Sequence, residues 1–180
     1  MSYDLCVWDP ARHAPLPANA DEALETMERL SNIADSLNPL MRDFSRALVQ
    51  RYEAAASMQE AQQTMVTFWG SDPRESAAEC KTAVFRLGLP SDAGTAQLAY
   101  VVEAAARRGL VVFDDENGMC FLPTGTIFPE DMREMWQSDL AELMAGPVDP
   151  NLDVPDSRTL LQQIAGELFD AIGRGERRIS

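Results

Sequence analysis

Apolar and polar positions alternate at the start of the chain and then recur at helical spacing. Residues 3–8 predict a strand with two distinct faces, one with Tyr3, Leu5 and Val7 and the other with Asp4, Cys6 and Trp8. The stretch "PARHAPLP" at 10–17 predicts a loop, because proline fixes φ and lacks a backbone donor. The pattern then changes to the helical period.

Two amphipathic helices are predicted next. The first begins at Asn19, which precedes Glu22 by three residues as in a capping box. The second begins at Pro39, since proline suits the first helical position. We expect inner faces formed by Leu24, Met27, Leu30, Ala34 and Leu37 in the first helix and by Met41, Phe44, Leu48, Tyr52 and Ala55 in the second.

The middle of the chain predicts strands around one helix. The β-branched and aromatic run 64–69 predicts a strand, "GSDPRESA" a connection, and 81–90 a second strand that pairs with the first. A helix over 95–108, with Leu98, Val101, Val102 and Ala105 facing inward, ends at Gly109 in a left-handed C-cap. Short strands at 110–113 and 119–122 flank an Asn117-Gly118 hairpin turn.

Two further helices are predicted in the last third. Glu130 and Asp131 lie in the first turn of one, where the helix dipole favours acids. Its apolar lining is Met132, Met135, Trp136, Leu140, Leu143 and Met144, and Gly146-Pro147 ends it. A final helix follows the acidic loop, with Leu160, Leu161, Ile164, Leu168, Phe169 and Ile172 inside.

This order of elements predicts an α+β protein with a ferredoxin-like βαββαβ antiparallel sheet. The first crossover is expanded, the C-terminal helices are extra, and we expect the helices on one face of the sheet. Residues 1–125 would form the sheet unit and 126–180 a helical extension on the same core, so that the 180 residues make a single domain.

Composition excludes several classes. Hydrophobic residues make up 46% of the chain, yet no run approaches the roughly 18–20 apolar residues of a membrane span. The start "MSYDLCVWDP" has two aspartates and no basic region, so we expect no signal peptide and a cytoplasmic location. Cys6, Cys80 and Cys120 are widely spaced, which favours reduced thiols over a disulfide framework or a zinc site.

Charge is distributed unevenly along the chain. The formal net charge is −14, and residues 111–156 hold eleven acids against one base, Arg133. Nucleic acid or an anionic membrane would need a basic stripe, so neither is an expected partner. The balance favours a basic protein partner, or solubility alone.

No residue pattern identifies a reaction, a cofactor or a metal. The hairpin does not match the calcium-loop pattern, because the first ligand position, counted back from Gly118, falls on Phe113. The only histidine, His13, would have to serve any Ser-His or Cys-His pair, but it lies in the proline-rich loop and Cys6 in a strand. Trp8 and Trp69 could share a sheet face, as an interface if it is open and as packing if a helix covers it. We therefore predict a protein that is not an enzyme.

The strongest candidate site is a set of acids in the second half of the chain. They follow the hairpin strand, spread over the helix at 130–145 and continue into the next loop: Asp114, Asp115, Glu116, Glu130, Asp131, Glu134, Asp139, Glu142 and Asp149. Two interpretations stay open. The acids form a partner-binding surface that accelerates encounter with a basic protein, or they only keep the chain in water.

Two segments carry a family resemblance. "MSYDLCVW" and "VVEAAARRGLVVFDDENG" resemble the opening strand and a later helix–strand segment of small bacterial immunity proteins of polymorphic and type VI secreted toxins. The resemblance implies a cytoplasmic inhibitor that binds and occludes the catalytic domain of one cognate toxin, and it supplies no functional residues. The alternatives are a non-catalytic regulatory or scaffold protein that acts as a homodimer through the face bearing Trp8, and a small enzyme without a motif.

Overall fold

An antiparallel sheet organises the residues that the computed structural model describes, which are 3–13, 15–35, 38–53, 69, 72–90 and 95–145. Its five strands are β1 (Tyr3–Trp8), β2 (Val84–Leu89), β3 (Val111–Asp114), β4 (Met119–Phe121) and β5 (Ile127–Phe128). They lie in the order β2-β1-β3-β4-β5, and every neighbouring pair is antiparallel. The α+β class and the antiparallel sheet are therefore confirmed.

Strand β1 is central, because it pairs with β2 over its whole length and with β3 on its other side. Its alternation divides two hydrophobic clusters. Leu5 and Val7 belong to one cluster, and Cys6 and Trp8 belong to the other. All four side chains are fully buried, so both faces of the sheet are covered.

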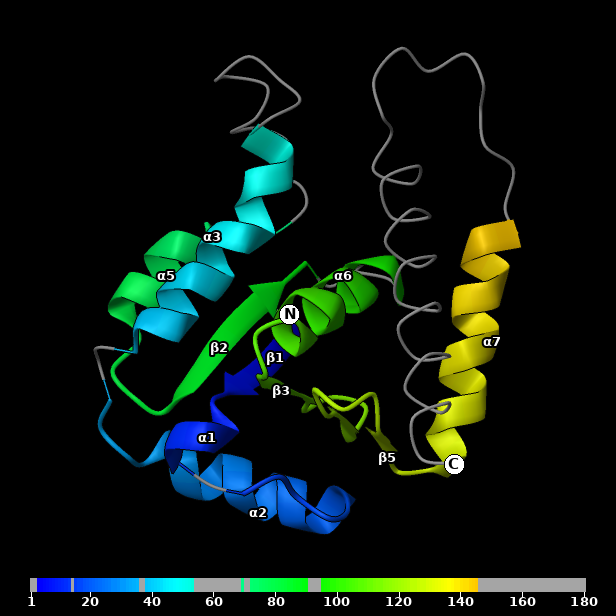
Figure 1. Cartoon of the computed structure of the whole chain (residues 1–180), viewed down its shortest axis with the longest axis horizontal. Helices are drawn as coiled ribbons and strands as arrows, with labels where there is room; N and C mark the ends of the chain where they lie inside the picture. The colour runs from blue at the N-terminus through cyan, green and yellow to red at the C-terminus, as the bar shows by residue number, and fades with distance from the viewer. Residues whose placement is uncertain are drawn as a thin grey trace.

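Helices lie on both faces of this sheet (Figure 1). The described helices are α1 (Pro10–His13), α2 (Ala20–Ser31), α3 (Pro39–Glu53), α5 (Pro73–Glu79), α6 (Thr95–Ala106) and α7 (Asp131–Ala145). Helix α2 covers the face with Cys6 and Trp8, whereas α3, α5, α6 and α7 contribute to the cluster on the face with Leu5 and Val7. The expectation of helices on one face only is therefore wrong.

The ferredoxin-like order is not confirmed. The strand expected at 64–69 lies outside the described residues except for Trp69, whose backbone is helical. Trp69 packs 5.8 Å from the ring of Tyr100 in the cluster of Leu5 and Val7, whereas Trp8 lies in the other cluster. The two tryptophans do not share a face, and Trp8 belongs to the core because α2 covers it.

Two short helices replace predicted loops because an aspartate caps each of them. Asp9 Oδ1 accepts a hydrogen bond from the Ala11 amide at the start of α1. Asp72 Oδ1 accepts one from the Arg74 amide, with Pro73 as the first residue of α5. Although burial raises it, hydrogen bonds and the charge of Arg74 hold the pKa of Asp72 below its ordinary value. Pro10 and Pro73 therefore start helices.

The second predicted strand begins later than expected. β2 starts at Val84 because residues 81–83 pair with the segment that follows α2: the Asp35 amide donates to the Lys81 carbonyl, and the Ala83 amide donates to the Ile33 carbonyl. This pairing places Asp35 beside α1.

The inner face of α2 differs from the predicted one. Asn19 caps the helix as expected, since its side chain accepts from the Glu22 amide at 2.9 Å. Its buried residues are Ala23, Thr26, Met27 and Leu30. Leu24 is 39% exposed, Ala34 falls beyond the end of the helix at Ser31, and Leu37 lies outside the described residues. In α3 the expected residues Met41, Phe44 and Leu48 are buried, while Tyr52 and Ala55 have side chains outside the described set.

The same substitution at two positions of α2 tests this register. Leu30→Ala should lower the free energy of unfolding by about 2–4 kcal/mol, because Leu30 is fully buried under the sheet. Leu24→Ala should lower it by less than about 1 kcal/mol. Urea unfolding followed by circular dichroism gives both values. Equal losses would mean that α2 is rotated or absent.

Candidate partner-binding surface

Asp114 is not available to a partner, because the structure uses its carboxylate to hold the β3–β4 turn. The residue is fully buried. Its Oδ1 accepts from the Glu116 and Asn117 amides at 3.1 and 3.0 Å, and its Oδ2 accepts from Asn117 Nδ2 at 2.9 Å. Gly118 completes the turn with a φ of 65°. Of the three hairpin acids predicted for the site, only Asp115 and Glu116 are exposed.

Helix α7 presents its acids to solvent. Trp136 and Leu140 of this helix are buried on its opposite side. Glu130, just before the helix, is exposed, and so are four helical acids: Asp131, Glu134, Asp139 and Glu142. We call these five acids the α7 acidic face. Asp149 lies outside the described residues.

The α7 acidic face and the hairpin acids lie on different elements. Asp115 and Glu116 belong to the β3–β4 turn, and α7 packs against α6 and β5. The structure thus puts four of the predicted acids on α7, one just before it and two on one turn.

These seven carboxylates are not neutralised by the described part of the chain. None of their side chains takes part in a hydrogen bond or an ion pair there. Arginines pair instead with other acids: Arg12 with Asp35, Arg74 with Asp72, Arg107 with Glu103 and Arg108 with Asp43. A stretch of unpaired carboxylates on one helix makes a negative surface potential.

An exposed methionine lies within the α7 acidic face. Met135 is 46% exposed, so the prediction that it faces the core is wrong. It follows Asp131 by one turn and precedes Asp139 by one turn. The face therefore combines negative charge with one large apolar side chain.

A pocket of about 100 Å³ adjoins the start of α7. Its lining comes from α6, from β4 and β5 with the turn between them, and from Trp136 of α7. The Trp136 side chain is 2% exposed, and its indole N–H has no hydrogen-bond partner in the described structure. Leaving such a donor unsatisfied costs about 1–3 kcal/mol. The pocket forms where α6, the β4–β5 segment and α7 pack together, so no local signal predicts it.

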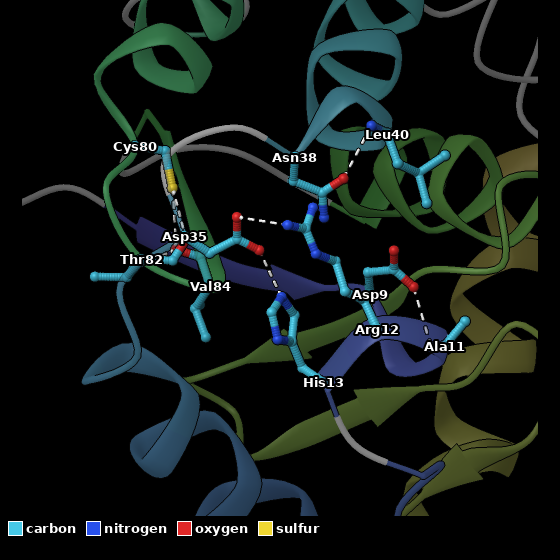
Figure 2. A network of polar contacts seen from close by, with 10 residues as sticks. All are labelled: Asp9, Ala11, Arg12, His13, Asp35, Asn38, Leu40, Cys80, Thr82 and Val84. Atoms are coloured by element: carbon cyan, nitrogen blue, oxygen red, sulfur yellow. Dashed lines mark hydrogen bonds and ion pairs between the residues drawn. The ribbon is translucent and has the colours of Figure 1, made fainter.

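Sequence reasoning also missed a polar network around His13, which Figure 2 shows. His13 Nε2 lies 2.6 Å from Asp35 Oδ2, and Arg12 Nη2 lies 3.2 Å from Asp35 Oδ1. The Asp35 side chain is only 6% exposed. The network joins α1 to the segment after α2, so the contact between His13 and Asp35 has a structural role.

Burial keeps two of the three thiols protonated. Burial raises the pKa of the Cys6 thiol to about 11, although the charge of Arg86 lowers it, and burial raises the pKa of Cys120 to about 12. The Cys80 thiol donates hydrogen bonds to the carbonyls of Thr82 and Val84, each at 3.4 Å (Figure 2). The described residues contain no group of three metal-ligating side chains.

No protein-family model, curated protein or solved structure matches the chain. Among the helices that the structure describes, none is both long and apolar enough to cross a membrane.

The thiols should differ sharply in alkylation by iodoacetamide. At pH 8 only about one Cys6 in a thousand is ionised at a pKa of about 11, and the thiolate is the reactive form. Half-buried Cys80 should be alkylated first, and buried Cys6 and Cys120 should react much more slowly, as mapped by peptide mass spectrometry. Labelling of all three at one rate in the native protein would contradict the burial of the sheet.

Neighbouring aspartates of the hairpin should differ in their contribution to stability. Asp114→Ala leaves two turn amides without their acceptor and should lower the free energy of unfolding by about 1–3 kcal/mol. Asp115→Ala removes an exposed side chain and should change it by at most about 0.5 kcal/mol. Thermal unfolding of the two variants checks this, and a larger loss for Asp115→Ala would contradict the turn geometry.

Proposed function

We propose that this protein is an immunity protein: it binds the catalytic domain of a cognate secreted toxin in the cytoplasm and occludes its active site. It performs no catalysis, and it needs no cofactor, because occlusion requires only a complementary surface. The proposal is supported by the resemblance of two sequence segments to immunity proteins of polymorphic and type VI secreted toxins, and by the character of α7.

The observation that carries the proposal is the α7 acidic face. Four exposed carboxylates of α7 and that of Glu130, just before the helix, make no ion pair within the described residues, and Met135 lies among the helical four. Complementary charge accelerates encounter with a basic partner and fixes its orientation. An apolar side chain in the same surface adds contact area that charge alone does not supply.

The sheet face that bears Trp8 gives no support to a homodimer. Trp8 is fully buried in a cluster with Ala23, Met27 and Leu30 of α2. A second copy could reach this face only after displacing α2 and exposing that cluster to water. We therefore place the partner on α7.

Growth rescue tests the role directly. A candidate toxin, a secreted protein whose variable C-terminal domain is encoded beside this gene, is expressed inside cells with and without this protein. We expect survival only with it, and binding of the purified toxin domain in a one-to-one complex. If this protein neither rescues growth nor binds that domain, the immunity role is wrong.

Charge reversal then tests the α7 acidic face against a matched control. The triple variant Glu130→Lys, Asp131→Lys and Glu134→Lys should slow association with the toxin domain by about tenfold or more at low salt, with a smaller difference at high salt. The control reverses three exposed acids of α2: Asp21→Lys, Glu25→Lys and Glu28→Lys. It changes the net charge equally, so stopped-flow association rates separate local from overall charge. Equal slowing by both variants would contradict the assignment to α7.

A further inference from the structure

The pocket beside α7 is bounded by ordered apolar groups. Val102 of α6, Phe121 of β4, Ile127 of β5 and Trp136 of α7 form its walls. The rings of Phe121 and Trp136 meet edge to face, with centroids 5.1 Å apart. These residues pack in one cluster with the sheet, so the walls are set by the core.

The turn between β4 and β5 closes another side of the pocket. The Leu122 amide donates to the Thr126 carbonyl at 2.9 Å, and the Gly125 amide donates to the Leu122 carbonyl at 3.0 Å. Gly125 has a φ of 88°, a conformation that glycine adopts readily. The pocket is therefore formed before any partner binds.

Size decides which class of occupant fits. Sites for cofactors and drug-sized ligands measure roughly 300–1,000 Å³. A dry cavity of about 150 Å³ is known to hold one benzene molecule. A pocket of about 100 Å³ therefore suits one aliphatic side chain better than a whole metabolite. Pockets that receive single side chains are typical of the centres of protein interfaces.

Position joins the pocket to the α7 acidic face. Ile127 lines the pocket, and Glu130 follows it by three residues, a span of at most about 11 Å. Trp136 faces away from the helical acids, so Glu130 is the acid of this face that the chain holds nearest to the pocket. A basic residue beside the bound side chain can therefore reach the Glu130 carboxylate.

We propose that this pocket receives one aliphatic side chain of the basic partner, with lysine or arginine residues on either side of it facing the α7 acidic face. The Trp136 ring forms one wall of the pocket, so its indole signal reports on occupancy. This inference rests on the proposed function and names the feature that the partner must carry.

Two synthetic peptides test the pocket on the full-length protein. One is a short lysine-rich peptide with a central leucine, and the other has alanine at the centre. Each is titrated into ¹⁵N-labelled protein, and the indole N–H signal of Trp136 is assigned by its loss in Trp136→Phe. The leucine peptide should bind at least about tenfold more tightly and should alone shift that signal, because only leucine fills the pocket.

A pocket-filling variant provides the matched control. Ala106 lines the pocket, and Ala106→Leu suits a helix while occupying part of the space. This variant should bind both peptides with the same affinity as the wild-type protein binds the alanine peptide. Its retained binding shows that it is folded.

The outcomes distinguish the contribution of the pocket to binding from that of the α7 acidic face. Equal affinities for the two peptides, with the Trp136 signal unmoved, would overturn the pocket and leave the α7 acidic face intact. Binding that is unchanged in the charge-reversed α7 variant would overturn the electrostatic part of the proposed function. If neither peptide binds at millimolar concentration and low salt, both the pocket and the attraction of basic chains to α7 are wrong.

Discussion

Burial of the sheet on both faces is the constraint on which the rest of the structure depends. β1 alternates between two apolar faces, and the side chains of Leu5, Cys6, Val7 and Trp8 are all fully buried. Removing this much apolar surface from water is the main stabilising contribution of the fold. It also withdraws the broad faces of the sheet from recognition, so a partner must be met by the outer sides of helices, by turns or by sheet edges.

The described carboxylates divide into those with local partners and those without. Asp114 holds a turn, Asp35 joins α1 to the segment after α2, and Asp72 caps α5. Each of these acids has a local task that explains why it is there. The exposed acids of α7 have no such task in the described structure, and an exposed Met135 and an apolar pocket lie near them. The apolar pocket and Met135 beside these acids are the reason that we propose α7, rather than another acidic helix, as the interface.

Local patterns predicted the elements better than their assembly. Alternation predicted β1 and the separation of its two faces, and Asn19 predicted the start of α2. The inner face predicted for α2 was partly wrong, because Leu24 matches the apolar period as well as Ala23 does. Only packing on the sheet decides between the two residues. Helix α5 was missed although Asp72, Pro73 and Glu75 form a start signal, because its seven residues are too short for a periodic pattern. The His13–Asp35 contact and the pocket join distant segments, so no local spacing reveals them.

Hydrogen exchange of this protein with and without the candidate toxin domain tests the central claim most directly. The α7 acidic face and the pocket predict slower amide exchange in residues 123–142 upon binding, and unchanged exchange in α2 and in the Asp114 turn. Protection confined to α2 or to the β2 edge, with 123–142 unchanged, would contradict the account.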